Sequence, residues 1–208
     1  MKHLFACLLF TLVFTASSCG PRVYTAPNAA ASTASHSVIA IIPPAVSIAG
    51  RPKDDPEHLR RAAEADVYAY QQDMYSWMLR RKQQGRLLGV DVLDPQTTNA
   101  ILERAGYGPD RRALTPSELA ELLEVDAVIT STFNTFKPMS EGAALAIGIL
   151  FDTWNPTRET TVNLSIYDPY DGMIWNYDWV ASGTFTSSAQ LVNGLMRNAS
   201  RRMPYAAK

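Results

Sequence analysis

Few side chains in this chain have the types and spacing that catalysis needs. Two carboxylates can hydrolyse a glycosidic bond, and Asp168 and Asp171 lie three residues apart. Both fall in an Asp-Pro-Tyr-Asp-Gly sequence, where turn formation already explains them. His36 and His58 have no second histidine or cysteine at zinc-ligand spacing, and the chain lacks a G-x-S-x-G elbow and a phosphate-binding P-loop. We therefore expect no catalytic residue, no metal site and no cofactor.

An aromatic row is the main candidate for ligand binding. Trp175, Tyr177 and Trp179 alternate with polar residues, so in a strand their side chains share one face. Such a row could stack on sugar rings and form a ligand face. It could equally be the apolar face of a sheet covered by a helix, and this is the interpretation that we favour.

Cys19 is the residue with the clearest chemistry, because its position suits lipid attachment. A basic start and an apolar run over residues 4–14 precede it. This run is too short to span a bilayer as a helix, which needs about 20 residues. The small residues at 16–18 followed by Cys19 resemble a bacterial lipobox, although position 16 is alanine where leucine is commonest. We expect residues 1–18 to be a signal peptide and Cys19 to carry the lipid. The alternative is an ordinary signal that leaves a free thiol.

The remaining composition sets the compartment and excludes some partners. Cys7 would be removed with the signal, so no disulfide is expected. Loss of Lys2 leaves 18 basic residues (19 − 1) against 20 acidic ones, a net charge of −2 that gives no indication of nucleic-acid binding. Gly20 is not the aspartate that retains lipoproteins in the inner membrane of enteric bacteria. We therefore expect an outer-membrane lipid anchor with the protein facing the periplasm.

The pattern of elements predicts one α/β domain over residues 37–205. Residues 19–36 are rich in Ala, Ser, Thr and Pro, which predicts a flexible lipidated tether. Apolar periodicity and capping residues predict strands at 38–42, 90–93, 127–136, 160–167 and 173–180, and helices at 54–84, 95–105, 115–124 and 187–203. The order β-α-β-α-α-β, then a β-hairpin, then α predicts a mixed sheet of about five strands flanked by helices.

One apolar segment does not fit this pattern. Residues 142–154 lie between two strands, where a polar connection is usual. The segment could pack in the core, contact another copy of the chain, or dip into a membrane. It is too short to span a bilayer as a helix. Its candidate contact residues are Leu145, Ile147, Ile149, Leu150, Phe151 and Trp154.

Three segments carry a family resemblance: Val38 to Pro44, Asp126 to Thr130, and the hairpin from Val162 to Trp175. With the lipid anchor before them, they resemble the periplasmic lipoproteins related to the curli-secretion protein CsgG, the TolB amino-terminal domain and the lipoprotein activators of peptidoglycan synthases. The resemblance implies a non-enzymatic scaffold or accessory subunit of an export or envelope-assembly complex, either as a homo-oligomer or with a protein partner. The alternatives are a regulator of a partner envelope enzyme and a glycan- or peptidoglycan-binding module.

Overall fold

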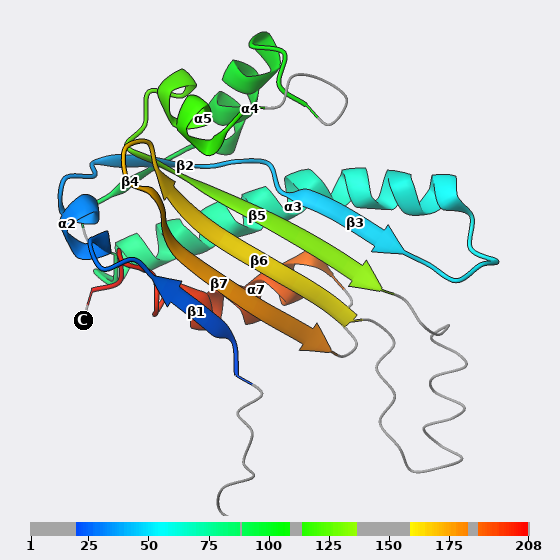
Figure 1. Cartoon of the computed structure of the whole chain (residues 1–208). Coiled ribbons are helices and arrows are strands. Elements are labelled where there is room, and N and C mark those ends of the chain that lie inside the picture. The colour runs from blue at the N-terminus through cyan, green and yellow to red at the C-terminus, as the bar shows by residue number, and fades with distance from the viewer. Residues whose placement is uncertain (1–19, 88, 109–113, 137–158, 183–186, 208) are drawn as a thin grey trace, which may run out of the picture.

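The computed structural model describes residues 20–87, 89–108, 114–136, 159–182 and 187–207, and these form a mixed sheet with helices packed on it (Figure 1). The strands are β1 (Arg22–Thr25), β2 (Val38–Ile41), β3 (Ala45–Ala49), β4 (Asp91–Leu93), β5 (Ala127–Phe136), β6 (Glu159–Asp168) and β7 (Gly172–Ser182). The helices are α2 (Ala29–Ala34), α3 (Pro56–Gln83), α4 (Pro95–Arg104), α5 (Pro116–Leu122) and α7 (Ser188–Ala199). No helix in this described part combines the length and apolar character needed to cross a bilayer.

The sheet confirms the predicted mixed α/β architecture. Its strand order is β1-β7-β6-β5-β2-β4, and β3 also pairs with β5. The strand β2 pairs in parallel with β4 and β5, and β3 pairs in parallel with β5. The pairs β5–β6, β6–β7 and β1–β7 are antiparallel. The sheet has seven strands rather than about five, because β1 and β3 were not predicted.

The strand β3 continues the path of β2 along β5. Ile39 to Ile41 pair with the first residues of β5, and Ala45–Ala49 pair with its second half. Between them, Pro43 and Pro44 have no N–H to donate to a strand ladder. The two prolines therefore divide one extended path into two short strands.

Local capping signals place the helices where the sequence predicts them. Asp55, Asp94 and Ser187 accept hydrogen bonds from backbone N–H groups in the first turns of α3, α4 and α7. Thr115 and Glu118 form a reciprocal capping box at the start of α5. These contacts satisfy N–H groups that have no partner within the helix.

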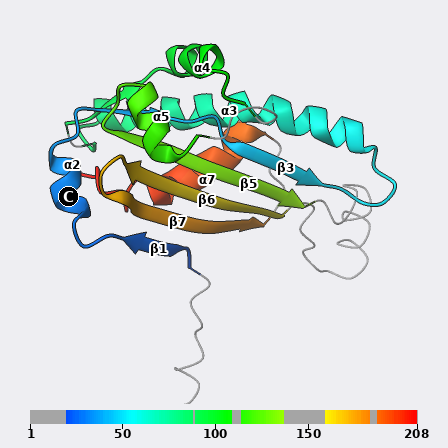
Figure 2. The same cartoon turned by 45° about the horizontal axis from the view of Figure 1, so that its top comes forward.

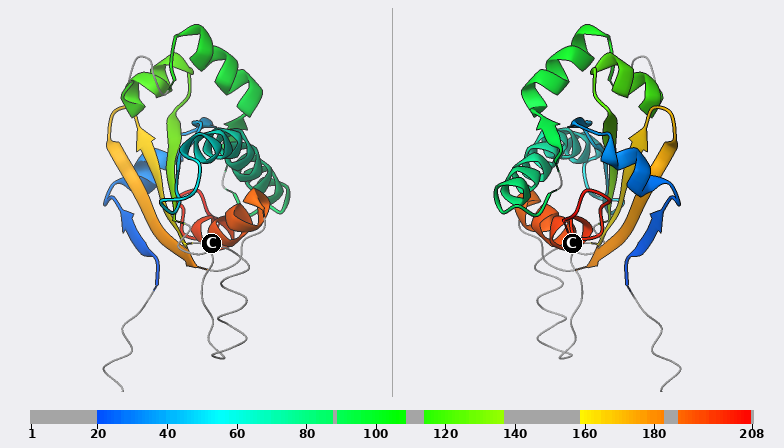
Figure 3. Two further views of the ribbon diagram at one scale, coloured as in Figure 1. Left: turned by 90° about the vertical axis from the view of Figure 1, so that its right-hand side faces the viewer. Right: turned by 90° about the vertical axis from the view of Figure 1, so that its left-hand side faces the viewer.

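Two apolar clusters hold the helices to the sheet. The larger one lies between the sheet and the helices α3 and α7, which share one side in Figure 3. Tyr70 of α3 stacks on Phe133 of β5 there, with ring centroids 4.3 Å apart. The smaller cluster packs α4 and α5 against β2 and the start of β5, through residues such as Leu102 and Leu119. Figure 2 shows these two helices above the sheet, apart from α7.

The face of the β5-β6-β7 sheet that points away from α3 and α7 is polar. Asn163 Nδ2 donates to Asp178 Oδ1 across β6 and β7 at 2.7 Å, and Asn176 Nδ2 donates to Ser165 Oγ at 3.0 Å. Asn163, Asn176 and Asp178 are half-buried there, whereas Ser165 is buried at 2% exposed. We call the four residues the polar sheet face.

The predicted flexible tether over residues 19–36 is wrong for residues 22–34. Arg22–Thr25 form β1, which pairs with β7 at the edge of the sheet, and Ala29–Ala34 form the helix α2. Composition did not reveal this because strand pairing uses backbone N–H and C=O groups, which every non-proline residue has. The folded body therefore begins at β1 rather than at residue 37.

Candidate functional site

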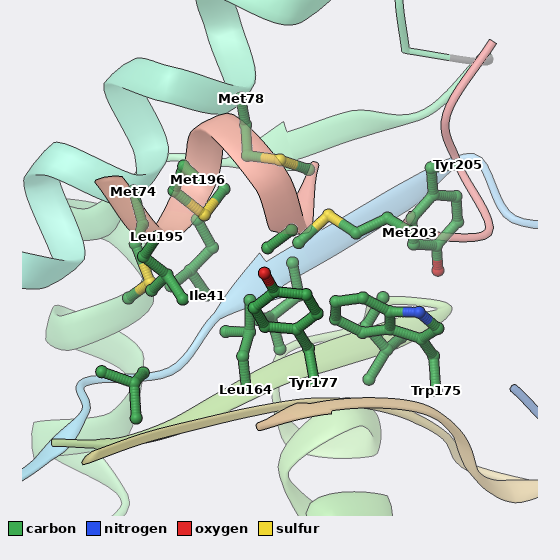
Figure 4. Close-up of a cluster of buried hydrophobic side chains, with 14 of the residues drawn as sticks. Ile41, Met74, Met78, Leu164, Trp175, Tyr177, Leu195, Met196, Met203 and Tyr205 are labelled. Atoms are coloured by element: carbon green, nitrogen blue, oxygen red, sulfur yellow. The ribbon is translucent and has the colours of Figure 1, made fainter. Parts of the chain in front are cut away.

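The aromatic row is part of the core. Trp175 and Tyr177 are both 0% exposed, and their rings stack with centroids 5.8 Å apart. Figure 4 shows both rings pointing from β7 toward the layer of side chains that includes Met196 of α7 and Met203, with Trp175 beneath Met203. Trp179 is half-buried beside α7. The interpretation as a sugar-binding face is therefore wrong for Trp175 and Tyr177, since α7 and the C-terminal tail cover them.

Two other predicted sites lie outside the described residues. Cys19 immediately precedes the first described residue, and the six apolar contact candidates from Leu145 to Trp154 belong to residues 137–158. Both remain predictions.

A buried polar cluster joins three distant parts of the chain, and we call it the N-terminal junction. His36 Nε2 lies 2.9 Å from Asp168 Oδ2, and His36 Nδ1 lies 2.6 Å from the Tyr205 hydroxyl. One residue follows α2, one ends β6, and one belongs to the C-terminal tail. Beside them, Ser32 Oγ donates to Asp171 Oδ2 at 2.5 Å. The junction therefore fixes α2 to the β6–β7 turn and to the C-terminus.

Both ring nitrogens of His36 are occupied, and this decides what the junction can do. A neutral ring donates its Nε2–H to Asp168 and accepts the Tyr205 hydroxyl at Nδ1. With both hydrogen bonds in place, neither ring nitrogen is free to take a proton from a substrate. The geometry favours a structural role for His36 over acid–base catalysis.

The carboxylate of Asp168 is stabilised in its charged form. Burial alone would raise its pKa, but hydrogen bonds from the Asp171 N–H, the His36 side chain and the Tyr170 N–H together hold that pKa below its usual value. The pKa of Tyr205 is raised, mainly by burial and further by repulsion from Asp168. At neutral pH the junction thus contains a carboxylate and a protonated tyrosine.

Asp126 fixes the strand that follows the junction. Its Oδ2 accepts the N–H groups of Ser37 at 2.7 Å and Val38 at 2.9 Å. The hydrogen bond from Val38 is the main reason why the pKa of Asp126 is lowered, while burial opposes the shift. The start of β2 is therefore held to the start of β5 by a charged side chain.

A shallow cavity of about 250 Å³ lies beside the junction. Its walls come from the end of α2, the end of α5 and the β6–β7 turn, and they are formed by Ser35, His36, Ala120, Glu121, Glu124, Val125, Asp126, Asp168, Pro169 and Tyr170. Four of these are acidic. Within the described residues, no group of three or more His, Cys, Asp and Glu side chains is arranged to hold a metal ion.

Sequence reasoning missed the junction because its members are far apart in the chain. His36 and Tyr205 are separated by 169 residues, and His36 lies in a segment whose composition is typical of a tether. Asp168 was correctly assigned to the turn, where its Oδ1 accepts the N–H groups of Tyr170 and Asp171 at 2.7 Å. Its second oxygen was free to bind a partner that no local pattern identifies.

No family model matches the chain, and no curated protein matches it in sequence. Among solved structures, the lipoprotein GNA1162 from Neisseria meningitidis is 12% identical with a TM-score of 0.44, covering 80% of this chain and 96% of that one. A PelC dodecamer from Paraburkholderia phytofirmans is 11% identical (TM-score 0.38, 91% and 99% covered). The LpoB C-terminal domain from Salmonella enterica is 9% identical (TM-score 0.33, 70% and 82% covered). We draw no functional conclusion from similarities at this level.

Proposed function

We propose that this chain is a non-enzymatic lipoprotein of the bacterial envelope that acts as a scaffold or accessory subunit at the surface of the outer membrane. The lipid on Cys19 would hold it there, facing the periplasm. The observation that carries the proposal is the position of β1, which begins only three residues after Cys19 and pairs with β7 in the sheet.

This position limits how far the body can lie from its anchor. Three extended residues span about 10 Å, whereas an undocked segment of 18 residues would span about 60 Å. The sheet is therefore restrained close to the lipid headgroups. A partner in or against the same membrane would then be within reach, and confinement to that surface raises the effective concentration of the subunits.

Lipid attachment is tested first. We expect labelled palmitate to be incorporated into the wild type and lost in Cys19→Ser, with a mature N-terminus at position 19 by mass spectrometry. Membrane fractionation should show the wild type in the outer membrane. A mature protein that begins elsewhere, or that stays aqueous with a free thiol, would refute the proposal.

Two experiments test the scaffold role: the size of the detergent-extracted complex, and the effect of lengthening the segment between Cys19 and β1. We expect the detergent-extracted wild type to elute as a multisubunit complex. A flexible insert of 20 residues between Pro21 and Arg22 should weaken cross-linking to partners in intact membranes, because it releases the restraint. The same insert in the exposed loop between Pro52 and Lys53 is the matched control. Equal cross-linking in the wild type and both insertion variants would contradict the inference that the short segment before β1 restrains the body near the membrane.

A regulator of one partner enzyme is the second candidate, and the polar sheet face favours it. Asn163, Asn176 and Asp178 are half-buried on a surface that α3 and α7 leave uncovered, and the buried Ser165 hydroxyl bonds to two of them. A monomer in detergent that cross-links to a single envelope protein through this face would support the regulator and count against the scaffold.

A further inference from the structure

The strand β1 forms an open edge of the sheet. Among the described strands it pairs with β7 alone, and it is the outermost strand of this side in Figure 1. The Ala26 N–H donates to the Ile174 carbonyl at 2.9 Å, so every second residue along β1 points its backbone groups toward β7. Val23 and Thr25 are out of step with Ala26, and their N–H and C=O groups therefore point away from the sheet. We call these outward backbone groups the free edge.

The side chains of β1 leave the free edge accessible. Val23 is 41% exposed and Tyr24 is 48% exposed, and no residue of the strand is buried. Tyr24 lies directly opposite Asn176, so its side chain is on the same side of the sheet as the polar sheet face. A strand edge that has unpaired backbone groups and contains no proline is a template for pairing with another strand.

We propose that the free edge pairs with the same edge of a second copy of this chain, antiparallel and about a two-fold axis. Val23 of each copy then faces Thr25 of the other, and each of these pairs exchanges both of its N–H···O hydrogen bonds. Tyr24 faces Tyr24 of the second copy as a non-hydrogen-bonded pair, in which opposite side chains approach most closely. The sheets of the two copies become one continuous sheet.

Two prolines favour this register over its neighbours. Pro21 and Pro27 flank β1, and neither has an N–H to donate. In the next register on either side, a proline lies opposite Thr25 or Val23, and a carbonyl group on the free edge has no donor. The pairing of Val23 with Thr25 is the register that satisfies all the outward backbone groups of the strand.

The short connection to the anchor identifies a second copy as the partner. The strand β1 begins only three residues after Cys19, so the free edge lies within about 10 Å of the lipid-bearing residue. Every lipidated copy then holds its free edge at the same height above one membrane, where confinement raises the effective concentration. This step rests on the proposed function, whereas the geometry of the free edge does not depend on it.

The first test is a disulfide at the two-fold axis. Residues 20–208 contain every described element and no cysteine, so one substitution gives one thiol per copy. We expect Tyr24→Cys to form a disulfide-linked dimer under mild oxidation, because the Cα atoms of a non-hydrogen-bonded pair are about 4.5 Å apart.

Arg22→Cys is the matched control, since Arg22 is also exposed and belongs to the same strand. In the proposed register it lies opposite Ala26 of the second copy, and the two introduced thiols are separated by about 13 Å along the strands. Disulfide formation should be about tenfold slower or more than in Tyr24→Cys, because a disulfide needs Cα atoms less than about 7 Å apart.

The second test removes hydrogen bonds from the free edge. Val23→Pro deletes an N–H that points away from β7, so β1 can keep its pairing with β7. We expect the dissociation constant for self-association of residues 20–208, measured by analytical ultracentrifugation, to rise about tenfold or more. Val23→Ala keeps this N–H and should associate more tightly than Val23→Pro. Circular dichroism checks the fold of both variants, and the cysteine pair decides alone if Val23→Pro unfolds.

The outcomes separate this inference from the proposed function. Linkage specific to Tyr24→Cys, in a protein that incorporates no palmitate, supports the edge pairing and counts against the lipid anchor. Palmitate incorporation with equal linkage in Tyr24→Cys and Arg22→Cys, both in solution and in membranes, overturns the edge pairing alone. Self-association that Val23→Pro leaves unchanged also overturns it. So does a Tyr24→Cys thiol that links in intact membranes to a different protein.

Discussion

Replacing His36 with alanine should destabilise the protein far more than its position near the N-terminus suggests. The change leaves two buried groups without their partner, the Asp168 carboxylate (6% exposed) and the Tyr205 hydroxyl (1% exposed). An unsatisfied buried group costs about 1–3 kcal/mol, so two such groups together cost about 2–6 kcal/mol. We expect a loss of about 3–5 kcal/mol in the free energy of unfolding.

The assay is urea denaturation at pH 7, followed by circular dichroism, with a thermal melt as a second measurement. At about 2–4 °C per kcal/mol for a domain of this size, the melting temperature should fall by roughly 10 °C. His58→Ala is the matched control, because His58 is an exposed histidine at the start of α3 and should change stability by less than about 0.5 kcal/mol. A loss below 1 kcal/mol in His36→Ala would show that the junction does not hold α2 to the body.

Three further predictions follow from other contacts. Trp175→Ala should cost about 3–5 kcal/mol in a denaturation experiment, whereas Tyr170→Ala, at a residue 96% exposed, should be nearly neutral. Because the pKa of Asp168 is lowered in the folded state, its contribution to stability is complete above its unfolded pKa of about 3.9 and is lost as the pH falls through the lower folded value. At pH values below about 4, the urea concentration at the unfolding midpoint should therefore decrease. The difference in stability between the wild type and Asp168→Asn should shrink in the same pH range. Gly172→Ala should cost about 1–2 kcal/mol in thermal unfolding, since Gly172 has a φ of 73°.

The helices and the central strands were predictable because their signals are local. A cap such as Asp94 followed by Pro95 marks a helix start within two residues, and the apolar run of β2 marks a strand without knowledge of its neighbours. The β6–β7 turn was equally clear from its Asp-Gly pair.

The edge strands and the junction were not predictable in this way. The strand β1 has no buried side chain, so it leaves no apolar pattern, and β3 is a short strand in which no residue is fully buried. Strict alternation along β7 would put Met173 on the same face as Trp175, but a β-bulge at Ile166/Tyr167 shifts the register, and Met173 is 39% exposed. The pairing of His36 with Tyr205 depends on the whole topology, which one sequence window cannot contain.

The long sequence separation within the junction also orders events during synthesis and export. A chain emerges from its N-terminus, but β1 pairs with β7, and His36 pairs with a tyrosine 169 residues later. The strand β1 therefore cannot dock until almost the entire polypeptide has appeared. If Cys19 is lipidated as proposed, the modifying enzymes would meet it on an undocked, accessible segment, before completion of the C-terminus brings β1 into the sheet.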